Sequence, residues 1–229
     1  MAYAAAGRRL EVRCRLVVGA DGRQSAVRAQ AGIELRRTDP VHAIGGLLVA
    51  GAPEWPADLN ATATESDVAC LVFPLGGGSH RLYLCCAMEE RARFAGPGGA
   101  ARFLDAFHLA SLPRPPVLPA ATPAGPCAAF PGDDTSAPTP FADGVVLVGD
   151  TAGHSNPLIG HGLSLAGRDV RVLSELLLAS PDWLPAALLP YCEERGERMR
   201  RVRFAASLSA ELAPRSELPP SDGAGARWR

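Results

Sequence analysis

The feature of this sequence that most constrains its fold is a short apolar run that ends in a glycine and an aspartate. Residues 145–148 read Val-Val-Leu-Val, and Gly149 and Asp150 follow directly. A short run of mostly β-branched residues is typical of a strand buried on both faces of a parallel sheet. Asp150 would then lie at the carboxyl end of the strand, where open α/β sheets bind ligands. Its carboxylate would accept hydrogen bonds from ligand hydroxyls, or, alternatively, only cap the following turn.

A helix is expected after this strand, beyond a loop that contains Pro157. Apolar residues recur at 3-4-3-4 spacing and predict one buried stripe, made of Leu163, Ala166, Val170, Leu173 and Leu177. Charged residues lie off this stripe, namely Arg168, Asp169, Arg171 and Glu175, of which Arg171 and Glu175 are spaced to pair. Gly160 and Gly162 would leave the backbone N–H groups at the helix start uncovered, where negative charge is favoured. The alternative is an ordinary core helix with glycines at its entry.

A second strand, turn and helix are expected near the N-terminus, in the stretch RLVVGADGRQSAVR. Asp21 and Gly22 form a turn pair in which glycine can adopt positive φ. Ser25 is a suitable N-cap for a short helix, and Gly32 is suited to end it. Arg28 would lie on the first turn of that helix, in reach of a phosphate or a carboxylate. The alternative for Arg28 is a solvated surface arginine.

Together the two segments resemble FAD-dependent monooxygenases of the aromatic (p-hydroxybenzoate) hydroxylase type. VVGADGRQSAVR is similar to the DG motif of that family, and GVVLVGDTAGHSNPLIGHGLSLAGRD is similar to its GD motif. The resemblance covers residues 10–32 and 143–180 closely and the intervening chain loosely. It implies a mixed α/β (α+β) fold, with an incomplete Rossmann-like FAD/NAD(P)-binding domain and a substrate lobe rich in β-sheet.

The resemblance also assigns site residues. Asp150 would bind the ribityl chain of FAD, Asp21 would lie near the pyrophosphate, and Pro157, Leu158 and Ile159 would lie beside the isoalloxazine ring. The full set of implied cofactor-binding residues is Asp21, Gly22, Arg28, Gly149, Asp150, Pro157, Gly160, Gly162, Leu163 and Ser164. The last three would present the helix start to the pyrimidine edge of the flavin. Two positions depart from the family pattern, since many members have histidine in place of Gly153 and asparagine in place of Ser164.

One part of the family pattern is missing. Members begin with a strand, a turn and a helix that carry G-x-G-x-x-G, which holds the pyrophosphate of FAD. Here the DG motif begins near residue 16, and residues 96–101 match G-x-G-x-x-A only by letter, because they follow charged residues and contain a proline. We therefore expect a loop before a short helix at residues 96–101. We also expect a C-terminal portion of a flavoprotein that by itself binds FAD weakly or not at all, and a separate chain could supply the missing unit.

The domain organisation follows from the motifs. Residues 1–40 and 143–212 are expected to form the FAD-binding part, residues 41–142 the substrate lobe, and residues 213–229 a disordered tail. Within the lobe we expect strands at 41–50, 68–75 and 81–87, a hairpin turn at 76–79, a helix at 100–110 and an irregular, proline-rich stretch at 113–140. Residues 183–212 predict a helix with a solvated charged face, made of Glu193, Arg195, Glu197, Arg198 and Arg200.

Composition excludes several other classes of protein. The 229 residues are 47% hydrophobic with a net charge of −1, which suits a globular core and argues against a basic nucleic-acid-binding surface. No apolar run reaches membrane-spanning length and the N-terminus lacks a signal-peptide core, so a cytoplasmic location is expected. The six cysteines contain no C-x-x-C pair and are expected as buried free thiols. The histidines have no metal-binding spacing, and His154 and His161 are expected to be partly exposed loop residues.

The activity implied by the resemblance is hydroxylation of a small organic substrate, aromatic or polyketide-like, with NAD(P)H as reductant and O2 as co-substrate. The flavin would carry the chemistry and the protein would orient it and exclude water, so no catalytic acid or base is assigned. A flavin reductase or epoxidase of the same fold, and a non-catalytic or partner-dependent remnant, remain alternatives. A serine hydrolase is a weaker fit, because the sequence around Ser164 falls one residue short of G-x-S-x-G.

Overall fold

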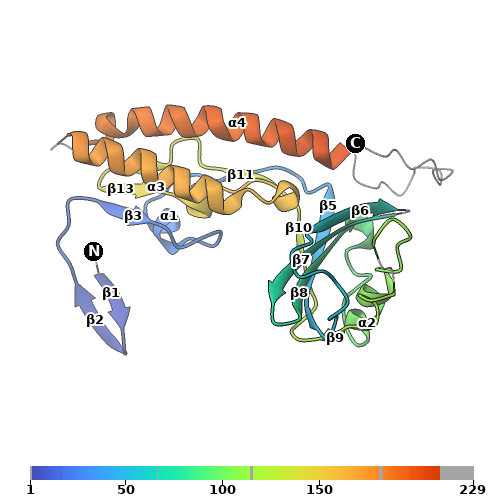
Figure 1. Ribbon diagram of the computed structural model, residues 1–229. Coiled ribbons are helices and arrows are strands. Elements are labelled where there is room, and N and C mark those ends of the chain that lie inside the picture. Colours follow the sequence, from blue (N-terminus) through green and yellow to red (C-terminus); the bar gives the residue numbers. More distant parts are fainter. Residues whose placement is uncertain (1, 66, 114–115, 181–182, 212–229) are drawn as a thin grey trace. The chain divides into compact units, whose positions relative to one another are not determined.

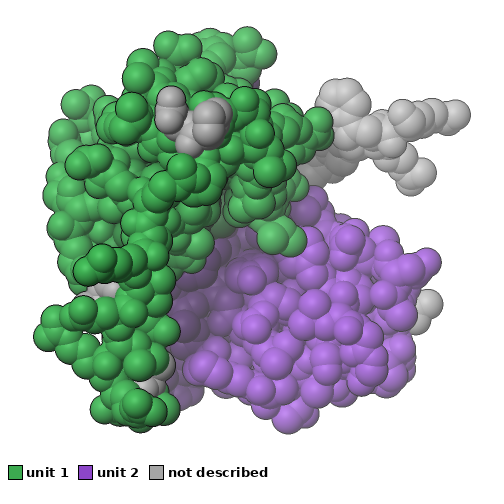
Figure 2. Space-filling view, turned by 90° about the vertical axis from the view of Figure 1, so that its left-hand side faces the viewer, with its two compact units in different colours: residues 1–39, 133–207 green, residues 40–132, 208–229 purple. Residues whose placement is uncertain are grey.

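The computed structural model describes residues 2–65, 67–113, 116–180 and 183–211 (Figure 1). The chain divides into two compact units, which Figure 2 shows in different colours. Unit 1 contains residues 1–39 and 133–207, and unit 2 contains residues 40–132 and 208–229. The tail expected at 213–229 lies outside the described residues. The mixed α/β class predicted from the sequence is confirmed.

A three-stranded sheet forms the centre of unit 1. Its order is β12 (Phe141–Ala142), β13 (Val145–Leu147) and β3 (Val17–Gly19). β13 runs parallel to β3, with Val146 opposite Val18, and antiparallel to β12. Val146 and Leu147 are fully buried. The predicted buried parallel strand is therefore confirmed, and its neighbour is the strand of the other motif.

Three helices accompany this sheet, namely α1 (Ala26–Gln30), α3 (Gly162–Ala179) and α4 (Leu189–Glu211). Figure 1 shows α3 and α4 lying side by side over the strands. The core beneath them consists of Phe141, Val146, Val148, Val172, Leu173, Leu188 and Tyr191. The Tyr191 hydroxyl donates a hydrogen bond of 2.7 Å to the carbonyl oxygen of Leu147, so α4 is fastened directly to β13.

Short elements complete unit 1. They are the strands β1 (Ala2–Ala5), β2 (Arg8–Glu11), β4 (Arg36–Arg37) and β11 (Thr135–Ser136), and the 3₁₀ helices η2 (Gly149–Ala152), η3 (Pro157–Ile159) and η4 (Pro185–Leu188). β1 pairs with β2 and β4 pairs with β11, both antiparallel. Ser25 caps α1 as predicted, because its hydroxyl accepts a hydrogen bond of 2.9 Å from the amide of Arg28. Gly32 follows α1 with a φ of 64°.

The predicted faces of the two long helices are partly wrong. On α3, Leu163 and Val170 were expected in the core, but they are 88% and 53% exposed. Asp169, expected in solvent, is fully buried beside Val172 and Leu173. Spacing alone identifies a stripe but not which side of it packs. The exposed pair of Arg171 with Glu175 is confirmed at 3.0 Å.

On α4, the expected solvated face is wrong at two of its five positions. Arg195 is buried, and the Arg198 side chain is largely buried. Both guanidinium groups form ion pairs with Asp169 of α3, so the charges that sequence patterning assigns to solvent neutralise one another between the helices.

Unit 2 is built on an antiparallel sheet of order β10-β5-β8-β7-β6, with β9 added beside β5. The long strands are β5 (His42–Ala50), β7 (Val68–Gly76) and β8 (Ser79–Ala87), and the shorter ones are β6 (Ala61–Glu65), β9 (Thr122–Pro123) and β10 (Ala128–Pro131). The three predicted strands and the glycine-rich hairpin turn between β7 and β8 are confirmed. The stretch 113–140 is less irregular than expected, because β10 pairs with β5 over four residues.

One face of this sheet packs on helix α2 (Gly99–Asp105), which is preceded by the 3₁₀ helix η1 (Met88–Glu90). Phe103 and Phe107 are fully buried in a core with Leu47, Leu82 and Leu84. α2 ends five residues earlier than predicted. The loop expected at residues 96–101 is confirmed up to Gly98, which has a φ of 73° and precedes the helix.

The boundary between the units differs from the one read off the sequence. Residues 133–142, expected in the substrate lobe, group with unit 1. They do so because β11 pairs with β4 and β12 pairs with β13. Hydrogen bonds to distant strands, which local sequence does not reveal, place this segment.

Cysteines are free thiols throughout, as predicted, but three of the six are not buried. Cys70, Cys85 and Cys86 are buried in unit 2, while Cys14 is exposed and the remaining two are intermediate. Burial raises the pKa of Cys70 to about 11 and that of Cys85 to about 12. No helix among the described residues combines the length and the apolar character that crossing a membrane requires.

Candidate functional site

Two turns that are far apart in the sequence meet at one edge of the unit 1 sheet. The parallel pairing of β3 and β13 brings both carboxyl ends to the same edge, so Asp21-Gly22 lies beside the turn of η2. The amide of Gly22 donates a hydrogen bond of 2.8 Å to Oγ1 of Thr151. Nη1 of Arg28 donates a hydrogen bond of 2.9 Å to the carbonyl oxygen of Thr151. Thr151, a residue that the sequence did not single out, therefore joins the two motifs into one site.

Asp150 lies on η2 with its carboxylate accessible. Its side chain is 41% exposed and forms one ion pair, with Nε of Arg23 at 3.3 Å. Gly149 has a φ of 60°, and a Cβ there would lie 3.4 Å from the Cβ of Ala166 in α3. The positive φ therefore favours glycine at the turn between β13 and Asp150. The carboxylate retains lone pairs that can accept hydrogen bonds from ligand hydroxyls.

Asp21 is committed to the start of α1. Its Oδ1 accepts a hydrogen bond of 2.5 Å from the Ser25 hydroxyl, and its Oδ2 accepts one of 3.1 Å from the amide of Val27. Burial acts to raise the pKa of Asp21, but these hydrogen bonds outweigh it and lower the pKa. The group is thus an ionised cap at neutral pH, beside the Gly22 backbone.

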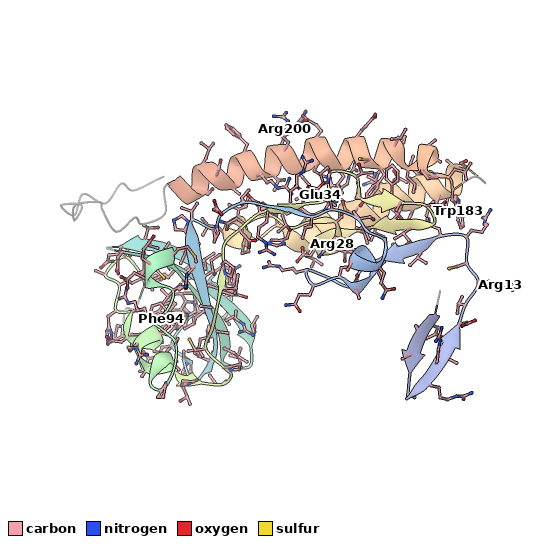
Figure 3. The ribbon with its side chains drawn as sticks, turned by 180° about the vertical axis from the view of Figure 1, so that it is seen from behind. Arg13, Arg28, Glu34, Phe94, Trp183 and Arg200 are labelled. Carbon is pink, nitrogen blue, oxygen red and sulfur yellow. The ribbon has the colours of Figure 1, made fainter. Side chains whose placement is uncertain are left out.

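Arg28 is hydrogen-bonded to the backbone of both turns and is not a solvated surface arginine. Besides its bond to Thr151, its Nη2 donates a hydrogen bond of 3.0 Å to the carbonyl oxygen of Arg23. Figure 3 shows the Arg28 side chain beneath the strands of unit 1. Both hydrogen bonds go to carbonyl oxygens, so in this structure the guanidinium positions the two turns.

The loop that follows Asp150 is held on β11 by hydrogen bonds to the backbone and the side chain of Thr135. The amide of Thr135 donates to the carbonyl oxygen of His154 at 2.9 Å, and the amide of His154 donates to Oγ1 of Thr135 at 3.0 Å. Gly153 approaches so closely that a Cβ there would lie 2.4 Å from the Thr135 carbonyl oxygen. Asn156 caps η3, on which Pro157 occupies the first turn. The loop is therefore a fixed surface beside Asp150.

Next comes the start of α3. Gly160 has a φ of 67°, and a Cβ at either Gly160 or Gly162 would meet nothing within 4 Å. Leu163 and Ser164 are exposed on the first turn. This open helix start can accept an electron-rich group, because its N–H groups and dipole favour negative charge. Ser164 lies within the helix and not on a strand-to-helix turn, which argues against a serine nucleophile.

Two buried polar atoms in this loop have no partner within the described part of the chain. They are Oγ of Ser155 and Nδ1 of His161. Buried polar atoms in folded proteins are nearly always hydrogen-bonded, so these two are free to bind a polar ligand group. The accessible carboxylate, the open glycines and these two atoms fit a cofactor that has hydroxyl groups and a flat polar ring, such as FAD.

The burial of one histidine in this loop was not predicted. His154, expected to be partly exposed, is buried, and its Nδ1 lies 2.8 Å from Oγ1 of Thr135. Its Nε2 lies 3.4 Å from Oδ1 of Asp133, whose other oxygen pairs with Arg37. Burial and the charge of Arg23 lower the pKa of His154, against the opposing effect of Asp133. Within the described ranges, no cluster of histidine, cysteine and carboxylate side chains suits a metal ion.

Solved structures of related fold include flavoenzymes. PqsL from Pseudomonas aeruginosa, a probable FAD-dependent monooxygenase, is 27% identical with a TM-score of 0.64, over 82% of this chain and 53% of PqsL. CabE, an aromatic hydroxylase from angucycline biosynthesis, is 25% identical with a TM-score of 0.62, over 86% of this chain and 39% of CabE. HpxO of Klebsiella pneumoniae, solved with FAD, shares the fold at 22% identity, with a TM-score of 0.68, over 88% of this chain and 53% of HpxO.

This chain thus spans about half or less of the length of each of these structures. A search of curated protein sequences finds no match. The model of one protein family, described as the FAD binding domain, matches residues 1–204. Because this match covers most of the chain and agrees with the fold and the geometry of the two turns, the chain belongs to the FAD binding domain family and has the fold of FAD-dependent hydroxylases.

Proposed function

We propose that this protein is an FAD-dependent monooxygenase that hydroxylates a small aromatic or polyketide-like substrate, with NAD(P)H as reductant and O2 as co-substrate. The observation that carries the proposal is the joining of the two motif turns through Thr151, beside an accessible Asp150. A cytoplasmic location, where NAD(P)H is available, is part of the same proposal.

Different residues of unit 1 would contact different parts of FAD. Asp150 would accept hydrogen bonds from the ribityl hydroxyls, and the Gly22 turn would approach the pyrophosphate. Pro157, with its two successors on η3, would lie along the ring. The start of α3 at Gly162 would face the electron-rich edge of the ring. When bound, FAD supplies the redox chemistry that activates oxygen, and the protein orients the ring and excludes water.

Unit 2 offers an aromatic surface for a substrate. Two successive glycines of β5 distinguish the two faces of the sheet. A Cβ on Gly45 would lie 3.1 Å from Phe103, whereas a Cβ on Gly46 would lie 3.1 Å from Tyr83, so Phe103 and Tyr83 lie on opposite faces. The Phe103 face is the one covered by α2. On the other face, Phe73 and Tyr83 are half-buried and contact each other edge to face at 6.1 Å. Such a face suits an aromatic or apolar substrate.

A partner-dependent form of the protein is the second candidate. In the described residues β3 pairs with β13 alone, and Val18 on β3 is exposed. Parallel sheets are normally covered on both faces, and an open strand edge presents backbone groups to which another strand can pair. For this partner-dependent form, we propose that a strand of a separate polypeptide pairs with β3 and that a helix of the same polypeptide packs on the sheet. Reduction or epoxidation would use the same cofactor site and remains an alternative reaction.

The test begins with the purified 229-residue chain and FAD. Quenching of FAD fluorescence gives the Kd, and oxidation of NADH or NADPH in the presence of small phenols gives the activity. Asp150→Ala should weaken FAD retention, whereas Glu175→Ala, an exposed change on α3, should leave it unchanged. Equal FAD binding by Asp150→Ala and the unmodified chain would exclude the role proposed for Asp150. Flavin reduction without a hydroxylated product would favour a reductase, and FAD binding only with an added partner would favour the second candidate.

A further inference from the structure

A buried cluster of charges lies directly behind the turn that carries Asp150. Asp169 of α3 is fully buried, and it pairs with two arginines of α4. Nε of Arg195 lies 3.0 Å from its Oδ2, and Nη2 of Arg198 lies 2.5 Å from its Oδ1. Arg198 also pairs with Glu194 at 3.0 Å, so it has a second carboxylate nearer the surface.

Besides pairing with each other, the Asp169 and Arg195 side chains both form hydrogen bonds with the backbone of the turn. Oδ2 of Asp169 accepts a hydrogen bond of 2.7 Å from the amide of Gly149. Nη2 of Arg195 donates hydrogen bonds of 3.1 Å to the carbonyl oxygen of Gly149 and 2.9 Å to that of Gly153. The two side chains therefore hold three backbone groups, which lie immediately before and three residues after Asp150.

Stability alone is a poor explanation for this arrangement. Removing two charges from water costs free energy that their attraction only partly returns, so a buried ion pair is often replaced by apolar residues at little cost. The three hydrogen bonds to the turn are different, because no apolar side chain can make them. They also hold Gly149 at its positive φ, a conformation that fixes the direction of Asp150.

We propose that Asp169 and Arg195 are positioning residues that hold the turn from Gly149 to Gly153 in the conformation in which Asp150 can bind the cofactor. The effect on the cofactor rests on the function proposed above. The effect on the turn does not, and it can be measured without any ligand.

The experiment compares four variants of the full chain. Arg195→Met removes the contacts to Asp169 and to both carbonyl oxygens, and Arg195→Lys retains the charge but cannot span all three acceptors. The double variant Asp169→Leu with Arg195→Met replaces the pair by apolar side chains of similar size. Arg200→Met is the control, because Arg200 lies on the outer side of α4 (Figure 3), 70% exposed, and pairs with Glu197.

Hydrogen exchange of the peptide that covers residues 148–154 is the first measurement, and the Kd for FAD is the second. We expect exchange about tenfold faster or more in Arg195→Met and in the double variant, with smaller changes in the strands of unit 2. The Kd for FAD should rise about tenfold to a hundredfold, which corresponds to the loss of charge-assisted hydrogen bonds to the turn. Arg195→Lys should retain only part of the exchange protection and part of the affinity for FAD, and Arg200→Met should change neither.

The outcomes separate the two ideas. Unchanged exchange at residues 148–154 in a folded Arg195→Met chain would overturn the positioning role, whatever FAD does. Faster exchange across all of unit 1, including β3 and α1, would also overturn it, because the pair would then support the whole unit. Faster exchange confined to the turn, in a chain that binds no FAD even before mutation, would support the positioning of the turn and count against the proposed function.

Discussion

Thr151 provides a direct test of how the two motif turns are joined, through the variant Thr151→Val. The Thr151 side chain is fully buried, and its Oγ1 accepts the 2.8 Å hydrogen bond from the amide of Gly22. Valine has nearly the same shape but replaces the hydroxyl by a methyl group, so the Gly22 N–H loses its partner while the packing stays filled.

The expected cost follows from the burial of the groups involved. A buried donor left unsatisfied costs about 1–3 kcal/mol. Gly22 is only partly buried, so water can reach its amide to some extent, and we expect a loss in the lower half of that range, about 1–2 kcal/mol in the free energy of unfolding. The local effect should be larger than the global one, because the bond joins segments 129 residues apart.

Two measurements check this reasoning, namely urea unfolding and amide exchange at Gly22. Thr151→Ser is the matched control, since it keeps the hydroxyl and removes only a methyl group. Gly22 should lose protection in Thr151→Val and retain it in Thr151→Ser. Retained protection of Gly22 in the valine variant, with a stability loss below about 0.5 kcal/mol, would refute the link between the turns.

Three further predictions concern other parts of the chain. Burial lowers the pKa of His154, so on acidification the unfolded chain takes up a proton at this residue before the folded chain does. The free energy of unfolding should therefore be full above pH about 6.5 and fall as the pH drops toward the folded pKa. Urea unfolding at several pH values checks this, and the fall should be less steep in His154→Gln. Gly153→Ala should cost about 1–3 kcal/mol or more in thermal unfolding, since its Cβ would meet the Thr135 carbonyl oxygen at 2.4 Å, whereas Gly22→Ala, with open space around it, should cost less. Phe103→Ala should lower the unfolding free energy by about 3–5 kcal/mol, because this α2 side chain is fully buried in the core between the helix and the sheet; a loss below about 1 kcal/mol would contradict that packing.

Local patterns predicted several backbone elements of both units well. The strand that ends just before Gly149, the capped helix after Asp21 and the hairpin between β7 and β8 all depend on residues close together in the sequence. Turn glycines, an N-cap serine and runs of β-branched residues act through neighbouring atoms. Their conformations are therefore readable without knowing the rest of the fold.

Charged and apolar faces were predicted less well. Asp169 and Arg195 look like solvent-facing charges in their own helices, and each is buried only because the other helix supplies its counter-charge. Leu163 fits an apolar stripe yet is exposed, because α3 packs on the sheet through another side. The position of Asp169 late in the GD-type motif was the one signal in the sequence that could have identified it.

The sequence by itself determined that two strand–glycine–aspartate turns exist and that their resemblance is to a flavin-binding family. Only the tertiary structure decided that these turns touch through Thr151, that Arg28 faces backbone carbonyls, and that Asp169 and Arg195 hold the turn before Asp150. The physical reason is sequence separation. A turn or a cap is fixed by atoms a few residues away, whereas parallel pairing of β3 with β13 and the neutralisation of buried charges join residues that no local pattern relates.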